Sequence, residues 1–553
     1  MPVASPGDPA LAIGESPPPE SRHRRGPGGA PLLLRVLTLV VALLFALPLA
    51  YLLVRSTTGG GYLAATTSAT TRTPLLLSLV LAGAVSAGAA LLGTSTAWLV
   101  SRTDVPGRRL WRVLLPLPLV IPSFIGAFSL IAAFAPGGLV LRALSPLGIT
   151  SLPEVRGLPG AIGVLTLLTY PYVYLPVAAR LGQLTPSLEE AARLLGRRPR
   201  QVFFGVVLPQ LRPAVLAGTL LVFLYVISDF GAVALLRVET FAVRIFLAYG
   251  AFDVPTGLAL SLNLGLLALL VVVLERLAGR RSLRVATGRV VRGLTVPLGR
   301  WRPVATAWVG GTVTFALLAP VSVLTYWAGR GLLRGSSRAS SLAADPTALI
   351  GPALTTARLS ITAAVVAVVA VLPVAYLVVR HRNRTGEVAN AVVLSGFALP
   401  GIALALALTF WTVSSPALRW VYQTEALLVF AYVVHFGAQA LRAAEVAVTS
   451  VPPRLGDAAR ALGAGRWRRL RAVDLPLMLP GLLAGAGLVL LSTMKELPAT
   501  LLLAPPGVQT LATRIWVSTQ DAYLADASLG SLVLIALSAL LTWVLVIRRS
   551  DAL

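Results

Sequence analysis

The sequence predicts an all-α polytopic membrane protein, with about twelve transmembrane helices in two parallel six-helix repeats. First, only 12% of the 553 residues are charged and 56% are hydrophobic, whereas soluble domains are about 25% charged. Second, uncharged apolar runs recur, and about 20 such residues suffice to cross the hydrocarbon core. Third, an ordered set of residues occurs twice. Helices are expected because an open sheet cannot satisfy its backbone in lipid.

The twelve predicted spans divide evenly between the two halves of the chain. The first six lie near residues 32–54, 75–101, 113–135, 158–181, 213–236 and 257–275. The second six lie near residues 303–328, 356–379, 388–412, 425–441, 480–503 and 528–547.

The distribution of basic residues predicts the orientation of these spans. Of the 47 lysines and arginines, 34 fall in the loops on the N-terminal side, 12 in the opposite loops and Lys495 within a span. The positive-inside rule then places both termini in the cytoplasm. A pI near 11.6 would also suit a nucleic-acid binder. Because the basic residues alternate with apolar spans, we expect no nucleic-acid partner and assign the charge to the lipid bilayer.

Composition also limits the chemistry. There is no cysteine and there are only three histidines, so thiolate sites are excluded and we expect neither a metal site nor a cofactor. Residues 1–30, rich in Pro, Gly and Ser, are predicted to be a disordered cytoplasmic tail. No Gly-x-x-x-x-Gly-Lys-Ser/Thr phosphate loop occurs, so we expect no ATPase activity and no catalytic residue in this chain.

An internal repeat connects the two halves. The segment from Glu190 to Gly196 matches the segment from Asp457 to Gly463, at an offset of 267 residues. The pairs Leu208-Pro209 and Leu475-Pro476 keep that offset, whereas Pro122 and Pro400 are 278 apart, which indicates an insertion in the first half. We therefore expect a first repeat at 31–275, a basic cytoplasmic linker at 276–302 and a second repeat at 303–553. Six spans per repeat give both the same orientation.

The repeated loop has the chemistry of a docking element. Its alanines favour helix and add little bulk, and its glycine suits a left-handed helix C-cap. The predicted loop residues are Glu190, Ala191, Ala192, Gly196, Leu208, Pro209, Asp457, Ala458, Ala459, Gly463, Leu475 and Pro476. The Leu-Pro pairs are expected to end the loop before the next span. The alternative is a pair of basic interfacial helices that bind anionic lipid.

This acid-Ala-Ala-x-x-x-Gly pattern, followed by Val-x-Leu-Pro, resembles the loop signature of the permeases of ATP-binding-cassette importers. The resemblance implies coupling helices that dock on a separate ATPase dimer, and an extracytoplasmic binding protein that delivers cargo. It also implies the inner or plasma membrane of a prokaryote. Ser228-Asp229-Phe230-Gly231 and Lys495-Glu496-Leu497-Pro498 are similar to ferric-iron permeases. Thiamine, aminoethylphosphonate and polyamine remain alternative cargoes.

Two acids inside predicted spans are candidates for the translocation pathway. Asp229 and Glu496 are also 267 residues apart, and a carboxylate at such depth is costly unless it faces protein or water. Together with Ser228 and Lys495 they could line the pathway. The alternative is that each acid caps a helix end or that Glu496 pairs with Lys495.

Two other classes of protein share some of these features. A secondary transporter driven by an ion gradient can also contain two parallel repeats, but it does not need matched acid-Ala-Ala loops. A membrane enzyme would need clustered acids, histidines or a nucleophile within its spans.

Overall fold

The computed structural model describes residues 31–58, 62–151, 153–184, 186–280, 295–334, 346–381, 383–397 and 399–542. The predicted tail at 1–30 and residues 281–294 of the predicted linker lie outside the described residues. Within the described ranges all regular secondary structure is helical, and one isolated β-bridge joins Thr103 and Val296.

The helices of the first half come in sequence order as follows: α1 (Leu32–Thr58), α2 (Tyr62–Thr67), α3 (Ala69–Arg102), α4 (Arg108–Leu114), α5 (Ser123–Phe134), α6 (Leu139–Leu144), α7 (Leu158–Thr169), α8 (Pro171–Gln183), α9 (Pro186–Leu194), α10 (Pro199–Val202), α11 (Leu208–Ser228), α12 (Gly231–Leu235), α13 (Phe241–Gly250) and α14 (Val254–Arg280). Those of the second half are α15 (Arg302–Val313), α16 (Ala319–Arg334), α17 (Ile350–His381), α18 (Arg384–Gly396), α19 (Gly401–Ser414), α20 (Glu425–Ser450), α21 (Pro453–Ala461), α22 (Arg466–Arg469), α23 (Leu475–Met494), α24 (Pro498–Leu503), α25 (Leu511–Gln520) and α26 (Leu524–Thr542).

Eleven helical segments of the described chain are long and apolar enough to cross a membrane. A twelfth is obtained if α18 and α19, which are bent by 103° relative to each other, form one span. The predicted fold class is therefore confirmed. Two predicted spans end earlier than expected: α11 stops at Ser228 and α23 at Met494, and the short helices α12 and α24 follow.

The first span of each repeat packs against the other repeat. Helix α1 lies against α17, α18 and α19, whereas α15 lies against α3 and α4. Helix α16 packs on both α5 and α26. The two repeats are therefore interlocked in space, although their sequence boundaries, 31–275 and 303–553, remain a prediction.

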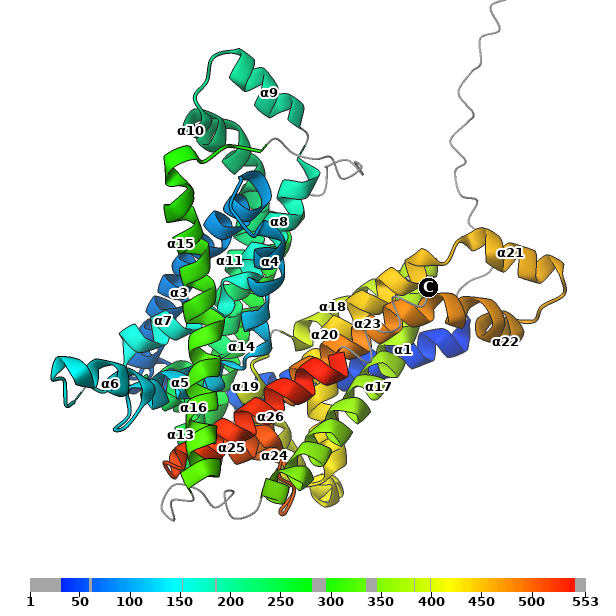
Figure 1. Ribbon diagram of the computed structural model, residues 1–553. Coiled ribbons are helices and arrows are strands. Elements are labelled where there is room, and N and C mark those ends of the chain that lie inside the picture. Colours follow the sequence, from blue (N-terminus) through cyan, green and yellow to red (C-terminus); the bar gives the residue numbers. More distant parts are fainter. Residues whose placement is uncertain are drawn as a thin grey trace, which may run out of the picture.

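Figure 1 shows two helical arms that meet at the end carrying α13, α24 and α25. The arms diverge toward their opposite ends, where α9 and α10 finish one arm and α21 and α22 finish the other. The two predicted docking loops therefore sit at the separated tips of the molecule.

Repeated glycines set the close packing within each arm. A Cβ atom on Gly218 of α11 would lie 2.8 Å from the Tyr172 carbonyl oxygen and from Val173 Cα in α8. A Cβ on the equivalent Gly485 of α23 would lie 2.6 Å from Ala443 Cβ in α20. Small residues let membrane helices approach this closely, so Gly218 and Gly485, which are 267 residues apart, are equivalent packing positions.

We expect Gly218→Ala to lower the melting temperature of the detergent-solubilised protein, because the new methyl group meets backbone atoms that cannot move aside. Overpacking of this kind costs about 1–3 kcal/mol. Gly83→Ala is the matched control, because nothing lies within 4 Å of a Cβ placed at that position on α3. Equal melting temperatures for the two variants, measured by scanning fluorimetry, would contradict this account of the packing.

Candidate functional site

The two predicted docking helices have the same pattern of exposure. In α9, Glu190 and Ala191 are exposed and Ala192 is buried. In α21, Asp457 and Ala458 are exposed and Ala459 is buried. Exposed leucines flank both acids, since Leu188 is 55% and Leu455 42% exposed. Each helix therefore exposes an acid, an alanine and a leucine that no other part of the described chain covers.

Both loop glycines adopt the left-handed conformation that the sequence predicts for a C-cap. Gly196 has φ +76° and Gly463 has φ +75°. In the first loop the Arg197 amide donates to the Ala192 carbonyl oxygen at 3.1 Å, and in the second the Ala464 amide donates to the Ala459 carbonyl oxygen at 2.9 Å. These bonds close the last turn of each helix and send the chain back toward the membrane.

The Leu-Pro pairs do not end the loops, so that expectation was wrong. Leu208-Pro209 and Leu475-Pro476 lie within helical runs that have already started, directly after the π-helical turns η3 (Phe203–Val207) and η8 (Leu470–Asp474). A proline has no N–H for the carbonyl four residues earlier. A widened π turn at the same place accommodates that missing bond.

A repeated arginine, which the sequence reasoning missed, holds each loop. Arg102 at the end of α3 donates from Nη2 to the carbonyl oxygens of Leu181 (2.9 Å) and Leu184 (3.3 Å). Arg380 at the end of α17 donates to those of Val448 (3.0 Å) and Val451 (2.7 Å). The two arginines are 278 residues apart, which is the offset of Pro122 and Pro400. The shared offset is the sequence signal that could have identified the two arginines as equivalent.

The two loops are braced differently behind this shared anchor. In the first, Arg102 also lies 3.4 Å from the buried Glu189 carboxylate, and Trp98 packs edge-on against Phe203 with ring centroids 5.2 Å apart. In the second, Arg469 contacts the Asp474 carboxylate at 3.1 Å and the Tyr376 hydroxyl at 2.6 Å. The aromatic contact between Trp98 and Phe203 in the first loop thus corresponds to the hydrogen bond between Arg469 and Tyr376 in the second.

A cavity of ≈ 390 Å³ lies between the two arms. Its walls include Ser228 and Asp229 at the end of α11, and Lys495 and Glu496 at the end of α23. The structure therefore brings all four candidate pathway residues to one cavity. The wall from the first half also carries Tyr172 and Tyr225, and the wall from the second carries Gln439, Ser492 and His435.

The two acids also cap the short helices that follow them. Asp229 Oδ1 accepts from the amides of Ala232 (3.0 Å) and Val233 (3.4 Å) at the start of α12. Glu496 Oε1 accepts from the Ala499 amide at 3.1 Å, at the start of α24. The helix-cap alternative and the cavity-lining placement therefore both hold in the structure, because each carboxylate does both.

The side chains of Asp229 and Glu496 differ in length, and the residue that packs beside each differs in size. Position 123, 278 residues before 401, holds a serine that interacts with the shorter Asp229 side chain. Position 401 holds a glycine, and a Cβ there would lie 2.5 Å from Glu496 Oε1. A longer acid beside a smaller partner fills the equivalent space in the second half.

Lys495 and His435 complete the polar part of the cavity. Lys495 Nζ donates to the Leu119 carbonyl oxygen of the other half at 2.9 Å, and within the described chain no ion pair joins it to Glu496. Its cation thus ties the two halves together. His435 also lines the cavity, and its Nε2 lies 4.0 Å from Glu496 Oε2.

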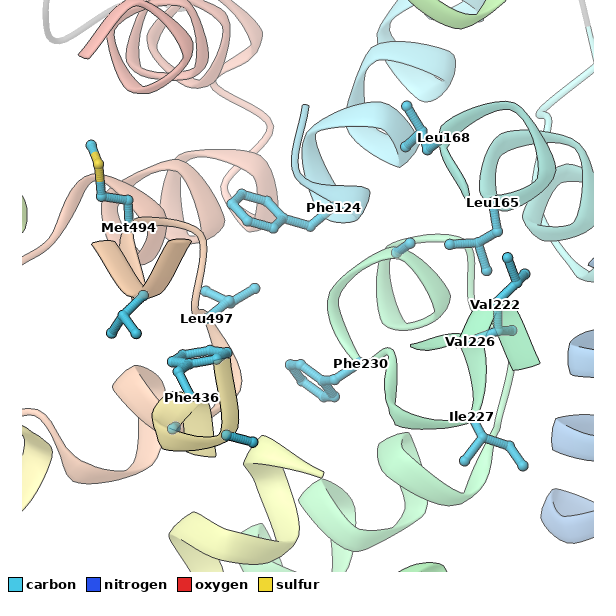
Figure 2. Close-up of a cluster of buried hydrophobic side chains, with 14 of the residues drawn as sticks. Phe124, Leu165, Leu168, Val222, Val226, Ile227, Phe230, Phe436, Met494 and Leu497 are labelled. Atoms are coloured by element: carbon cyan, nitrogen blue, oxygen red, sulfur yellow. The ribbon is translucent and has the colours of Figure 1, made fainter. Parts of the chain in front are cut away.

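Apolar side chains form the seam between the halves beside this cavity. Figure 2 shows Phe124 and Phe230 of the first half near Leu497 and Phe436 of the second. A Cβ on Gly231 would lie 3.2 Å from Leu497 Cδ2, and the rings of Phe230 and Trp516 are 5.4 Å apart. The halves are therefore in contact just beyond Asp229 and Glu496.

A duplicated all-helical membrane protein, with a polar cavity between its halves and matched exposed helices at its tips, is a transport permease. The chain belongs to the family described as binding-protein-dependent transport system inner membrane components, which matches residues 89–284 and 366–550. It is a multi-pass, non-catalytic membrane subunit, and the family is present in two copies, as the repeat predicted.

Curated relatives differ in how much of the chain they cover. The Fe(3+)-transport system permease protein FbpB 2 of Haemophilus influenzae is 30% identical over 93% of this chain and 98% of its own length. The sulfate transport system permease protein CysT of Salmonella typhimurium is 31% identical over 31% of this chain and 63% of its own length. The molybdenum transport system permease protein ModB of Mycobacterium bovis is 31% identical over 37% of this chain and 78% of its own length.

We expect the double variant Asp229→Asn, Glu496→Gln to reduce the initial rate of cargo uptake at least about ten-fold while the protein stays folded. Amide oxygens still accept from the capping N–H groups, so only the charge facing the cavity is removed. The matched control is Glu239→Gln with Asp521→Asn, which removes two exposed charges. Initial uptake rates in proteoliposomes give the readout, and unchanged uptake in the first variant would rule out a pathway role.

Proposed function

We propose that the chain is the translocation subunit of an ATP-driven importer, with ferric iron as its cargo. The cavity between the arms is the transit site, and the exposed faces of α9 and α21 receive a separate ATPase dimer. The observation that carries the proposal is the pairing of these features in one duplicated chain. Both acid-Ala-Ala helices are exposed at separated tips, while both span acids converge on one cavity.

The choice of cargo rests on the relative that covers nearly the whole chain, whose name specifies Fe(3+). The cavity supports passage of a cation, because Asp229 and Glu496 bring two carboxylates against one lysine. Within the described residues no group of three or more His, Cys, Asp or Glu side chains forms a metal site. The cavity would therefore pass the ion on without retaining it, and tight ligation would belong to the binding protein that delivers it.

The loop contacts support a mechanism in which force enters at the tips. When the ATPase dimer closes, it draws α9 and α21 together. Arg102 and Arg380 tie these loops to α3 and α17, so the arms move with them. Closing the tips opens the seam at Gly231 and Leu497, and the cavity becomes accessible from the opposite side, where the binding protein docks. Hydrolysis restores the state with separated tips.

The charge distribution supports the orientation that this mechanism needs. The tips carry the arginine-rich loops, with six basic residues at 180–212 and seven at 442–471. Under the positive-inside rule these loops face the cytoplasm, together with both termini. The seam end then faces the periplasm or the cell exterior.

The function is tested with proteoliposomes that contain the chain, its cognate ATPase and, outside, the binding protein loaded with radiolabelled ferric iron. We expect iron uptake that depends on ATP inside the vesicles and persists when ion gradients are collapsed. Uptake that follows an ion gradient without ATP would instead support a secondary transporter. ATP-dependent uptake of thiamine, aminoethylphosphonate or a polyamine in place of iron would overturn only the cargo.

Charge reversal at both loop acids, Glu190→Arg with Asp457→Arg, is expected to abolish coupling. Both side chains are exposed on the proposed docking faces, so an opposite charge meets the partner directly and costs several kcal/mol when desolvated. ATPase co-purification and ATP-dependent uptake should both fall to background. Glu387→Arg, an exposed acid of the same predicted side but outside the loops, is the control. Normal ATPase binding and uptake in the double variant would refute the docking assignment.

A further inference from the structure

A groove separate from the central cavity lies on the surface of the first arm. It has a volume of ≈ 570 Å³ and runs between α15 and the segment that leads into α4. Its lining is almost wholly apolar. The lining residues are Pro106, Trp111, Arg302, Pro303, Thr306, Ala307 and Gly310. None of these belongs to the coupling loops or to the transit site.

The walls of this groove are held in place by specific bonds. The Val296 amide donates to the Arg102 carbonyl oxygen at 2.8 Å, and the Leu298 amide donates to Asp104 Oδ1 at 2.9 Å. These bonds fix the start of α15 beside α4. In the opposite wall, which α4 and the segment before it form, Trp111 Nε1 donates to the Pro106 carbonyl oxygen at 2.8 Å. This bond orients the indole ring. The groove is therefore a formed feature of the fold.

Arg302 lines the groove, and the segments that form it carry four further exposed arginines: Arg108, Arg109 and Arg112 on α4, and Arg300 just before α15. None of them forms an ion pair with an acid in the part of the chain that the structure describes. Asp104, which precedes α4, accepts the Leu298 amide. An apolar slot with a positively charged rim is thus complementary to a ligand that carries both an anionic group and a hydrocarbon chain.

The equivalent surface of the second arm lacks the arginines of α4 and is covered by α1. Positions 278 residues after Arg108, Arg109 and Arg112 are Gly386, Glu387 and Asn390. Helix α1 also packs on α18 in the second arm, where a Cβ on Gly396 of α18 would lie 3.5 Å from Phe45 Cδ1. The groove is therefore particular to one arm, whereas a general positive-inside bias would affect both.

Its position along the helices identifies the environment of the ligand. Trp301 and Trp308 on α15 are 52% and 42% exposed, and Leu110 and Val113 on α4 are 56% and 62% exposed. Tryptophans beside arginines at the end of a span are typical of the level of the lipid headgroups. A basic pocket between spans at this level suits an anionic headgroup.

We propose that this groove binds one anionic diacyl phospholipid, with an acyl chain along Trp111, Pro303, Ala307 and Gly310 and its phosphate among the flanking arginines. Residues 281–294 of this chain are a poor alternative occupant, because they contain four arginines and no acid. The assignment is independent of the cargo and of the ATPase.

The test uses the purified full-length chain in nanodiscs of phosphatidylcholine mixed with phosphatidylglycerol. Lipid that stays bound after transfer to neutral detergent is counted by native mass spectrometry. We expect one phosphatidylglycerol to be retained by the unmodified chain, and its affinity to fall roughly 30-fold in Arg108→Gln with Arg302→Gln, from about 1 kcal/mol per arginine. Arg35→Gln with Arg384→Gln removes two basic residues of the same predicted side and should retain the lipid.

A groove-filling variant, Ala307→Phe, separates the lipid from a free anion. It keeps every arginine but blocks the acyl path, so phosphatidylglycerol should be lost. Inorganic phosphate, tested as a competitor, should displace the lipid only weakly. Retention in Ala307→Phe, equal loss in the two arginine pairs, or full displacement by phosphate would each overturn the assignment of a lipid site. Each outcome can be read without any transport assay, so it leaves the proposed import function untouched.

Discussion

The structure depends on how backbone groups are satisfied where two helices break inside the protein. An interrupted helix leaves N–H groups without partners, and in a membrane such groups must be satisfied by protein or by water in a cavity. Asp229 and Glu496 meet that need by accepting from the first amides of α12 and α24. Because a carboxylate at this depth is itself costly, it must also face a polar space. The helix breaks therefore need the capping carboxylates, and the carboxylates in turn need the polar cavity.

Duplication explains why the cavity has two matched walls, and fusion explains why they can differ. Asp229 with Ser123 and Glu496 with Gly401 fill equivalent spaces with side chains of different length. Tyr172 and Tyr225 pack together, with ring centroids 5.7 Å apart, where the second half has a hydrogen bond between Ser492 and Gln439. Lys495 and His435 have no charged counterparts at Ser228 and Leu168. A homodimer would place identical groups on both walls, whereas one chain can make one wall aromatic and the other polar.

Much of this was predictable because hydropathy and repetition are local signals. The spans, the two repeats, the left-handed Gly196 and Gly463 and the shared depth of Asp229 and Glu496 all follow from spacing. The partners of these residues do not. Hydropathy marks an apolar segment but not its neighbour, so it could not show α1 crossing to α17 and α18. Hydropathy also does not detect a short break in an apolar helix, which is why 213–236 and 480–503 were each predicted as one span. Arg102 and Arg380 looked like ordinary positive-inside charges, because their acceptors are backbone carbonyls that carry no sequence signal.

Arg102 and Arg380 also bear on how motion at a tip can reach a cavity one helix length away. Along α11 the distance from Leu208 to Ser228 is about 30 Å at 1.5 Å per residue, too far for a direct contact. Arg102 and Arg380 each bond two carbonyls at the start of a loop, so a loop cannot shift without its long helix. On the other side of each loop a π turn leads into α11 or α23 without a break in the helix. Each tip is therefore fixed at both of its roots to helices that continue to the cavity or pack beside it. A displacement applied at α9 or α21 must then move the arm as a body, and the contact that opposes this motion is the apolar seam at Gly231 and Leu497.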